Sequence, residues 1–133
     1  MDIYTIIIII LGAAMILYYQ AKLKNSGDRL DAEAFKEKLE QDSGIVIDVR
    51  SEGEHKAASL DITDHNIDVM QSNFNKKIEQ LDRDKNYYLY CRSGNRSGKA
   101  QRLMKGKGFQ RVYNIGGLQQ LLNAGFNKKT GKH

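Results

Sequence analysis

The sequence predicts a three-layer α/β sandwich around a mostly parallel central sheet, preceded by one apolar helix. Strand-like runs alternate with helix-like segments along the chain, which is typical of helices packed on the faces of a parallel sheet. Residues 45–49 are almost continuously apolar and β-branched, as expected for a strand that is buried on both faces. A third pattern, a long uncharged run at the N-terminus, predicts the helix that precedes the sandwich.

Residues 1–21 predict a membrane-spanning signal anchor. The 19 residues between Asp2 and Lys22 are uncharged, and a helix of that length spans about 28 Å, close to the thickness of the hydrocarbon core of a bilayer. The charges Lys22, Lys24 and Arg29 follow this run, so the positive-inside tendency places the next domain in the cytoplasm. A cleaved signal peptide is the alternative, but it requires positive charge before the apolar run, where this chain has only Asp2.

The remaining chain divides into a linker at residues 22–30, an α/β domain at residues 31–126 and a basic tail at residues 127–133. The composition of the tail predicts a disordered segment. Its basic residues are Lys128, Lys129, Lys132 and His133.

Hydrophobic periodicity and turn residues locate the elements of the domain. Asp31 is placed to cap the first helix. The spacing of Met70, Phe74, Ile78 and Leu81 predicts a helix with one face toward the core. We expect helices at residues 31–41, 70–81, 95–104 and 118–124, a short helix or loop at 51–58, and strands at 45–49, 66–69, 87–90 and 112–115.

Cys91 is the only cysteine of the chain and lies where a predicted strand gives way to a predicted helix. Ligands of a parallel sheet bind at the carboxyl ends of its strands. The small residues after Cys91 let the backbone curl so that successive N–H groups point at one spot, which favours an anion and would stabilise a thiolate. The residues that would surround the sulfur are Arg92, Ser93, Gly94, Asn95, Arg96 and Ser97.

A structural role for Cys91 is the alternative, because free cysteines often act as small buried hydrophobic residues. The two arginines, two glycines and two serines in the next seven residues favour a reactive site instead. A single thiol cannot form an internal disulfide, and the reducing cytosol would keep it free.

The charge of the chain does not indicate a nucleic-acid partner. The formal net charge is +5, but the basic residues are scattered among acidic ones and form no stripe with aromatic residues. Anionic lipid headgroups beside the anchor are the simpler partner for these charges. One cysteine and three scattered histidines offer no metal-ligand spacing, so we expect no metal and no organic cofactor.

Several motifs in a fixed order resemble the rhodanese-type sulfurtransferase domain over roughly residues 28–126. The loop that begins at Cys91 is the most specific of them. The others are Ile45-Val46-Ile47-Asp48-Val49-Arg50, Glu54, Asn66-Ile67 and Tyr113-Asn114-Ile115-Gly116-Gly117. The resemblance implies the rhodanese fold and a cysteine that carries sulfur.

The resemblance implies a two-step reaction on Cys91. The thiolate takes the outer sulfur of a small anionic donor such as thiosulfate and forms a persulfide, and cyanide, a thiol or a protein acceptor then removes that sulfur. Arg92 and Arg96 would border the anion pocket, and the amides of residues 92–97 would surround the transferred sulfur. Asp48, Arg50 and Glu54 match family positions that we expect to give structural support.

The chain departs from the family pattern at residues 58–65. A glycine–histidine pair is missing there, Ser59 stands about where the histidine would be, and His55 occupies a position that is commonly aromatic. His65 could be the base of a Cys–His hydrolase, but a solvated loop histidine is the simpler interpretation.

Two other functions remain open from the sequence. A cysteine phosphatase or arsenate reductase of the same fold needs arginine six residues after the cysteine, where this chain has Ser97. A non-catalytic docking module tethered to a membrane is the second, although such modules often lack the cysteine.

Overall fold

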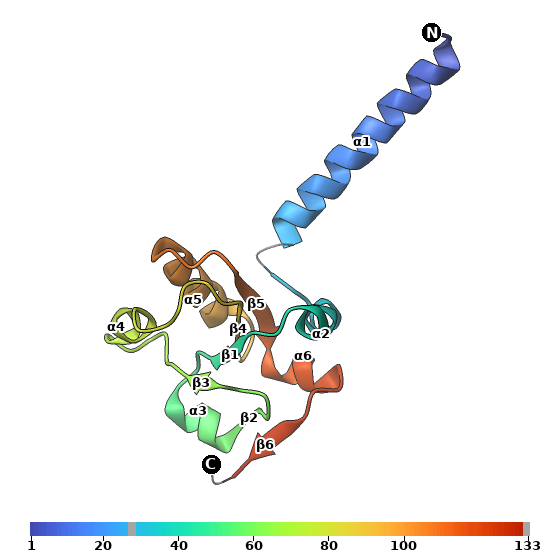
Figure 1. Ribbon diagram of the computed structural model, residues 1–133. Helices are drawn as coiled ribbons and strands as arrows, with labels where there is room; N and C mark the ends of the chain where they lie inside the picture. Colours follow the sequence, from blue (N-terminus) through green and yellow to red (C-terminus); the bar gives the residue numbers. More distant parts are fainter. Residues whose placement is uncertain (27–28, 132–133) are drawn as a thin grey trace.

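The computed structural model describes residues 1–26 and 29–131 (Figure 1). Helix α1 (Ile3–Ser26) extends away from the domain that follows it. Its stretch Ile3–Gln20 has a mean hydropathy of 2.0 and no buried share. This helix is therefore long and apolar enough to cross a membrane. A signal sequence near an N-terminus has the same length and composition, so it is the alternative interpretation.

The first part of the linker predicted at residues 22–30 is helical in the structure. Helix α1 continues to Ser26, because Lys22, Leu23 and Lys24 are good helix formers and no proline or glycine interrupts them. Residues 27 and 28 lie outside the described residues, and Arg29 already pairs with the domain through a parallel bridge to Asn114.

Four parallel strands form the central sheet, which confirms the predicted fold class. Strand β4 has a neighbouring strand on each side, β1 and β5, and all five of its residues are buried. A parallel sheet requires helices on its faces, and the chain supplies one between most successive strands. The strands, in spatial order, are β3 (His65–Asn66), β1 (Ile45–Asp48), β4 (Tyr87–Cys91) and β5 (Val112–Gly117).

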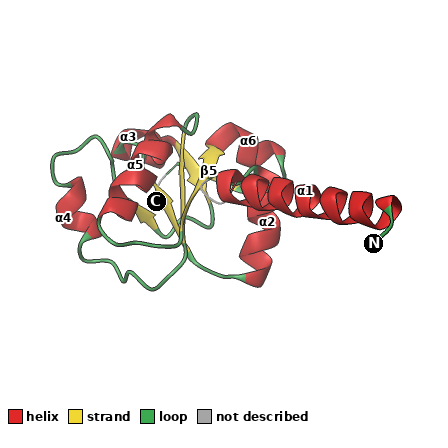
Figure 2. Ribbon diagram, turned by 90° about the horizontal axis from the view of Figure 1, so that it is seen from above, coloured by secondary structure: helices red, strands yellow, loops and turns green. Residues whose placement is uncertain are grey.

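The helices cover the two faces of this sheet (Figure 2). On one face, α2 (Ala32–Gln41) and α6 (Leu118–Asn123) place Phe35 and Leu121 in a core with Tyr88 and Tyr90 of β4. On the other face, α4 (Phe74–Ile78) and α5 (Asn95–Gly106) bury apolar side chains against the same strands. The core on that second face includes Ile47, Leu89, Phe74, Ile78, Met104 and Phe109.

Side-chain caps fix where two of the helices begin. Asp31 accepts a hydrogen bond from the amide of Ala34 at 2.8 Å and caps α2, as the sequence predicts. Ser51 and Glu54 form a reciprocal capping box at the start of α3 (Glu52–Ala57). This box sets the direction of α3 at the carboxyl edge of the sheet, where the predicted site lies.

The helix predicted at residues 70–81 is much shorter in the structure. A carboxylate oxygen of Asp68 accepts a hydrogen bond from the amide of Met70, which closes a turn before α4 and delays the helix until Phe74. Met70 is consequently exposed, whereas Phe74 and Ile78 are buried as expected.

The basic tail predicted at residues 127–133 is a strand over part of its length. Residues Lys128–Thr130 form β6, which pairs antiparallel with β2 (Ala58–Leu60). The sequence predicts disorder because the tail is rich in lysine. All three side chains of β6 are exposed, however, so their charges stay in water while the backbone pairs with β2. Lys132 and His133 lie outside the described residues.

Tyr90 of β4 ties β2 to the central sheet, and this contact predicts a stability effect. Its hydroxyl accepts a hydrogen bond from the buried amide of Leu60 at 3.0 Å. Tyr90→Phe would leave that amide without an acceptor, which costs about 1–3 kcal/mol in the free energy of unfolding. Urea denaturation of the full chain in detergent measures the change.

Tyr88→Phe is the matched control for this experiment. Tyr88 is also fully buried in β4, but its hydroxyl donates to the carbonyl of the exposed Asp42. Water can replace that donor, so we expect a smaller loss than for Tyr90→Phe. Equal losses in the two variants would contradict the role assigned to Tyr90.

Candidate active site

The loop after β4 bends around the sulfur of Cys91. The amide of Gly94 donates a hydrogen bond to Sγ at 3.0 Å, and the hydroxyl of Ser97 lies 3.4 Å from the same atom. Gly94 has a φ of +100°, which glycine adopts without strain and which turns the chain into α5. The sulfur thus lies at the N-terminal end of α5, where the backbone N–H groups carry partial positive charge.

The surroundings of Cys91 favour the thiolate. Burial alone would raise the pKa of the thiol, but hydrogen bonds from the Ser97 hydroxyl and from the amides of Ser97, Gly94 and Ser93 outweigh it and lower the pKa. Each of these donors stabilises the charged form of sulfur more than the neutral form. The residue is fully buried, so the loop holds the sulfur within the protein and not on its surface.

Asn114 of β5 holds the loop in this shape. Its Nδ2 donates to the carbonyl of Gly94 at 2.9 Å, and its Oδ1 accepts from the Ser97 hydroxyl at 2.7 Å and from the Gly116 amide at 3.0 Å. The Gly116 amide is a donor and the Gly94 carbonyl is an acceptor, so only one orientation of the Asn114 amide satisfies both.

The backbone of β5 makes room for the loop. The register between β4 and β5 shifts after Leu89, and Gly116 has a φ of +92° at this irregularity. A Cβ on Gly117 would lie 2.3 Å from the carbonyl oxygen of Arg92. Glycine is therefore required at position 117 for the loop to pack against the end of β5.

Arg96 forms a bidentate ion pair with Glu54 of α3. Its Nη1 and Nη2 donate to the two carboxylate oxygens at 2.7 and 2.9 Å. This pair, with a smaller contribution from Ser51, lowers the pKa of Glu54 to about 2. The guanidinium that the sequence places at the anion pocket is thus already paired with a carboxylate, which fixes the loop to α3.

Asp48 and Arg50 form a second ion pair, at the end of β1. Arg50 Nη2 lies 2.7 Å from Asp48 Oδ2 and also donates to the carbonyl of Ala58 in β2. His55 Nδ1 lies 3.0 Å from the same carboxylate oxygen. Asp48, Arg50 and His55 together connect the end of β1 with α3 and β2.

Arg92 is exposed and has no ion pair or hydrogen bond with the described residues. It lines an open cavity of about 520 Å³ beside the loop, together with Arg50 and Glu54 and with Leu118 and Gln119 of α6. An anion in this cavity would lie beside the guanidinium of Arg92, which can bond two of its oxygens.

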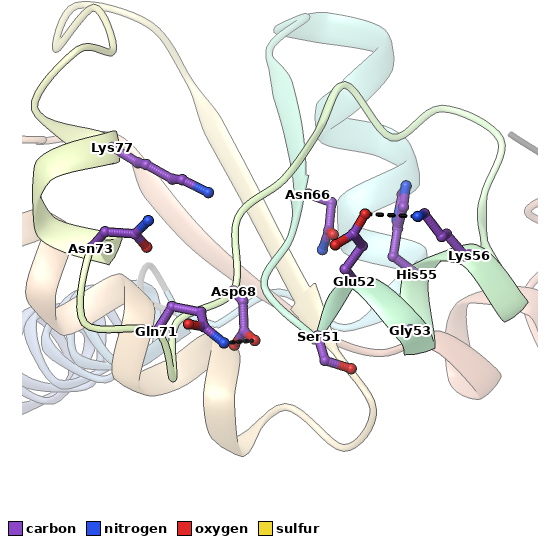
Figure 3. A pocket seen from close by; sticks show the side chains of 10 residues that line it. All are labelled: Ser51, Glu52, Gly53, His55, Lys56, Asn66, Asp68, Gln71, Asn73 and Lys77. Atoms are coloured by element: carbon purple, nitrogen blue, oxygen red, sulfur yellow. Dashed lines mark hydrogen bonds and ion pairs between the residues drawn. The ribbon is translucent and has the colours of Figure 1, made fainter.

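A larger cavity of about 790 Å³ lies between α3 and α4 (Figure 3). Lys77 and Asn73 project into it from α4, and the exposed Glu52–Lys56 pair borders it on α3. Its charges are of both signs, and none of the residues of the Cys91 loop lines it.

The structure brings together most of the residues that the sequence singled out. Gly94 and Ser97 contact the sulfur directly, and the amide of Ser93 is among the groups that lower the pKa of Cys91. The side chains of Ser93 and Asn95 are exposed, as is Arg92. His65 lies in β3 and is exposed. Among the described residues, no group of three or more His, Cys, Asp or Glu side chains gathers as a metal site would require.

The sequence analysis does not predict the role of Asn114. The residue lies in one of the family motifs, and the signal that could have shown its role is its polarity. It is an amide in an otherwise apolar buried strand, and such a residue usually bonds a specific partner.

The ion pair between Arg96 and Glu54 predicts a change of stability with pH. The pKa of Glu54 is lowered in the folded protein, so its contribution is present above its usual pKa of 4.5 and is lost as the pH falls from there to about 2. The Glu54 side chain is 34% exposed, and allowing for solvent screening we expect about 1 kcal/mol. Glu54→Gln should therefore lose less stability than the wild type over this range.

Glu52→Gln is the matched control on the same helix. Glu52 pairs with Lys56 on the exposed face of α3, and such pairs contribute little. Urea denaturation at pH 6 and pH 3 compares the three proteins. A Glu52→Gln protein that resembles Glu54→Gln would contradict the assignment.

Comparison with known proteins agrees with this geometry. The sequence matches the Rhodanese-like domain family over residues 31–124. A Bacillus subtilis protein named "Putative sulfurtransferase YtwF" is 33% identical over 90 residues, which cover 67% of this chain and 84% of that protein. Bacillus subtilis YqhL is 29% identical over 132 residues, covering 95% of this chain and 93% of YqhL, so this match extends into the apolar N-terminal segment.

Another relative shares only part of its length with this chain. The Bacillus subtilis protein named "Putative sulfur carrier protein YrkF" is 32% identical over 87 residues, and the match covers 65% of this chain but 45% of YrkF. Among solved structures, a rhodanese-related protein of Thermoplasma volcanium is 28% identical with a TM-score of 0.65, over 77% of this chain and 97% of that one. The chain belongs to the rhodanese-like domain family.

Proposed function

We propose that this chain is a sulfurtransferase that carries sulfane sulfur as a persulfide on Cys91. The observation that supports this most is the donor set around Sγ. Hydrogen bonds from two kinds of donor, a serine hydroxyl and backbone amides, converge on one sulfur and lower its pKa. The family and a relative named as a sulfurtransferase point to the same class of chemistry.

The first half-reaction loads the enzyme. The Cys91 thiolate attacks the outer sulfur of thiosulfate, a new S–S bond forms, and the original S–S bond breaks with its electron pair on the departing sulfite. The products are the Cys91 persulfide anion and sulfite, so charge and atoms balance. We expect the loop amides of residues 93, 94 and 97, which lower the pKa of the thiol, to stabilise the negative outer sulfur of the persulfide as well.

The second half-reaction returns the enzyme to its starting state. A nucleophile such as cyanide or a thiolate attacks the outer sulfur, and the bond to Sγ breaks with its electrons on Cys91. The product is thiocyanate or a new persulfide, and the thiolate is regenerated. No base is needed in either step when both nucleophiles are anions.

Arg92 supports an anionic donor in this scheme. It is the guanidinium of the loop that is not paired with a carboxylate, and it borders the open cavity beside the loop. A guanidinium can bond two oxygens of a sulfonate group at once. We therefore assign the first contact with the donor to Arg92, and loop support to Arg96.

The pairing of Arg96 argues against a phosphatase of the same fold. A phosphate ester needs a free guanidinium at the sixth residue after the cysteine, and that residue is Ser97, which bonds Asn114. Arg96 is one residue too early and bonds Glu54 through both terminal nitrogens. Hydrolysis of an aryl phosphate by this chain would favour the phosphatase instead.

The persulfide is tested by intact mass. We expect the full chain, incubated in detergent with thiosulfate and without reductant, to gain the mass of one sulfur atom and to lose it on addition of cyanide. Cys91→Ser should remain unmodified, and Lys85→Met, which changes a residue at the opposite edge of the sheet, should load like the wild type. The experiment compares thiosulfate with two other donors of sulfane sulfur. A failure with one donor can then be distinguished from a site that accepts no sulfur.

Absence of the added sulfur with every donor would contradict the proposal. In that case the non-catalytic docking module becomes the better interpretation of the conserved fold. Sulfur gain on Cys91→Ser would place the carrier elsewhere and would also reject the assignment.

We further propose that α1 anchors the domain to a membrane with the domain in the cytoplasm. The apolar stretch Ile3–Gln20 is exposed along its whole length, and Lys22, Lys24 and Arg29 follow it. The prediction is that the chain stays in the membrane fraction after carbonate washing and that a reporter fused to the C-terminus is active only in the cytoplasm. A cleaved N-terminus or an external reporter would contradict it.

A further inference from the structure

Arg29 lies next to the Cys91 loop, although it precedes the residues that match the family. It forms a parallel bridge with Asn114 at the open edge of β5. The next residue, Leu30, donates its amide to the carbonyl of Asn114 at 2.9 Å. The backbone of residues 29 and 30 thus extends the sheet by one short segment and pairs with the residue that shapes the loop.

The guanidinium of Arg29 lies against the outer side of the loop. A Cβ on Gly94 would lie 2.8 Å from Nη2 and 3.0 Å from Nη1 of Arg29, and a Cβ on Gly116 would lie 3.7 Å from the same Nη2. Both glycines therefore leave space that this side chain occupies. Arg29 is exposed and forms no ion pair or hydrogen bond with the described residues, so its donors remain available.

This guanidinium is close enough to influence the sulfur. The amide of Gly94 lies 3.0 Å from Sγ, and standard bond lengths then place Nη2 of Arg29 within about 9 Å of the sulfur. That distance is shorter than the screening length of about 10 Å in ordinary buffers. A positive charge near the N-terminal end of a helix is unfavourable by itself, and a thiolate at the same end of α5 offsets that cost.

We propose that Arg29 is a positioning residue of the sulfur-transfer site, which holds the Cys91 loop from outside and supplies a fixed positive charge to the thiolate and the persulfide. This proposal rests on the sulfurtransferase function proposed above. It gives the segment between the apolar helix and the domain a part in the site: only residues 27 and 28 separate Arg29 from the end of α1.

The experiment compares Arg29→Met and Arg29→Lys in the full chain in detergent. The thiolate of Cys91 is titrated by its ultraviolet absorbance, with Cys91→Ser as the background. Removal of the charge should raise the midpoint by about half a pH unit, less than the one to three units typical of a charge in direct contact. Arg29→Lys keeps the charge and should stay close to the wild type.

Sulfur loading supplies a second readout with a defined pH dependence. Below the midpoint, Arg29→Met holds less thiolate, so its loading rate should be about one third of the wild-type rate. Above the midpoint both proteins are fully ionised and their rates should converge. A role confined to folding would lower the rate at every pH and would also lower the melting temperature.

Two further variants serve as controls for the midpoint of the Cys91 titration, one that should leave it unchanged and one that should raise it. Lys85→Met removes one positive charge at the opposite, amino edge of the sheet, where Lys85 borders a separate cavity, and should leave the midpoint unchanged. Ser97→Ala removes a direct donor to Sγ and should raise the midpoint. The other charged groups near the loop are unchanged in the Arg29 variants, so a shift of the midpoint reports Arg29. They are Arg92 and Arg96 of the loop, Glu54 of α3 and the pair Asp48–Arg50 at the end of β1.

The outcomes separate this inference from the proposed function. A wild type that loads sulfur, with Arg29→Met unchanged in both midpoint and rate, would overturn the role of Arg29 alone. A shifted midpoint in a protein that never loads sulfur would support the electrostatic contact and overturn sulfur transfer. A shift that Lys85→Met reproduces would show a general charge effect and overturn the proposal.

Discussion

The side chain of Asn114 is the constraint on which the sulfur site depends. One amide group bonds the carbonyl of Gly94, the hydroxyl of Ser97 and the amide of Gly116. These three partners belong to the loop, to the first turn of α5 and to the irregular end of β5. Because the amide has one donor side and one acceptor side, the three segments can meet in only one arrangement. The donors around Sγ are therefore in place before any substrate arrives.

The charges of the site divide into two groups with different effects. Arg96 and Arg50 each pair with a carboxylate, so they fix the loop and β1 and add little net potential. The hydrogen-bond donors at Sγ are backbone amides and the serine hydroxyl at the N-terminal end of α5, and the proposed charge of Arg29 would add to them from outside the loop. Such dipoles stabilise one buried anion without attracting a second large one. This distribution suits a single sulfur atom better than a tetrahedral phosphate, which needs a mobile guanidinium around its oxygens.

The sequence predicts the sheet and its helices well but predicts segments at the edges poorly. Strands β1 and β4 are continuous apolar runs, and only a doubly covered sheet buries such runs. The short strands β2 and β6 carry no hydrophobic pattern, since β6 has three exposed residues and pairs through its backbone. Within the site, too, local features are predicted and distant contacts are not. The composition of the sequence indicates Cys91 and its loop. The partner of Arg96, Glu54, is 42 residues away in sequence, and its position depends on where Ser51 caps α3.

The course of the chain connects the apolar helix to the sulfur through very few residues. Helix α1 ends at Ser26, Arg29 contacts Gly94, and the amide of Gly94 bonds Sγ. If the stretch Ile3–Gln20 spans a membrane, residues 21–26 of α1 add about 9 Å and the connection from Ser26 to Arg29 adds at most about 10 Å, which limits how far the domain can lie from the membrane surface. A freely diffusing donor gains nothing from this proximity, but an acceptor or donor held at the membrane does, because confinement raises its local concentration.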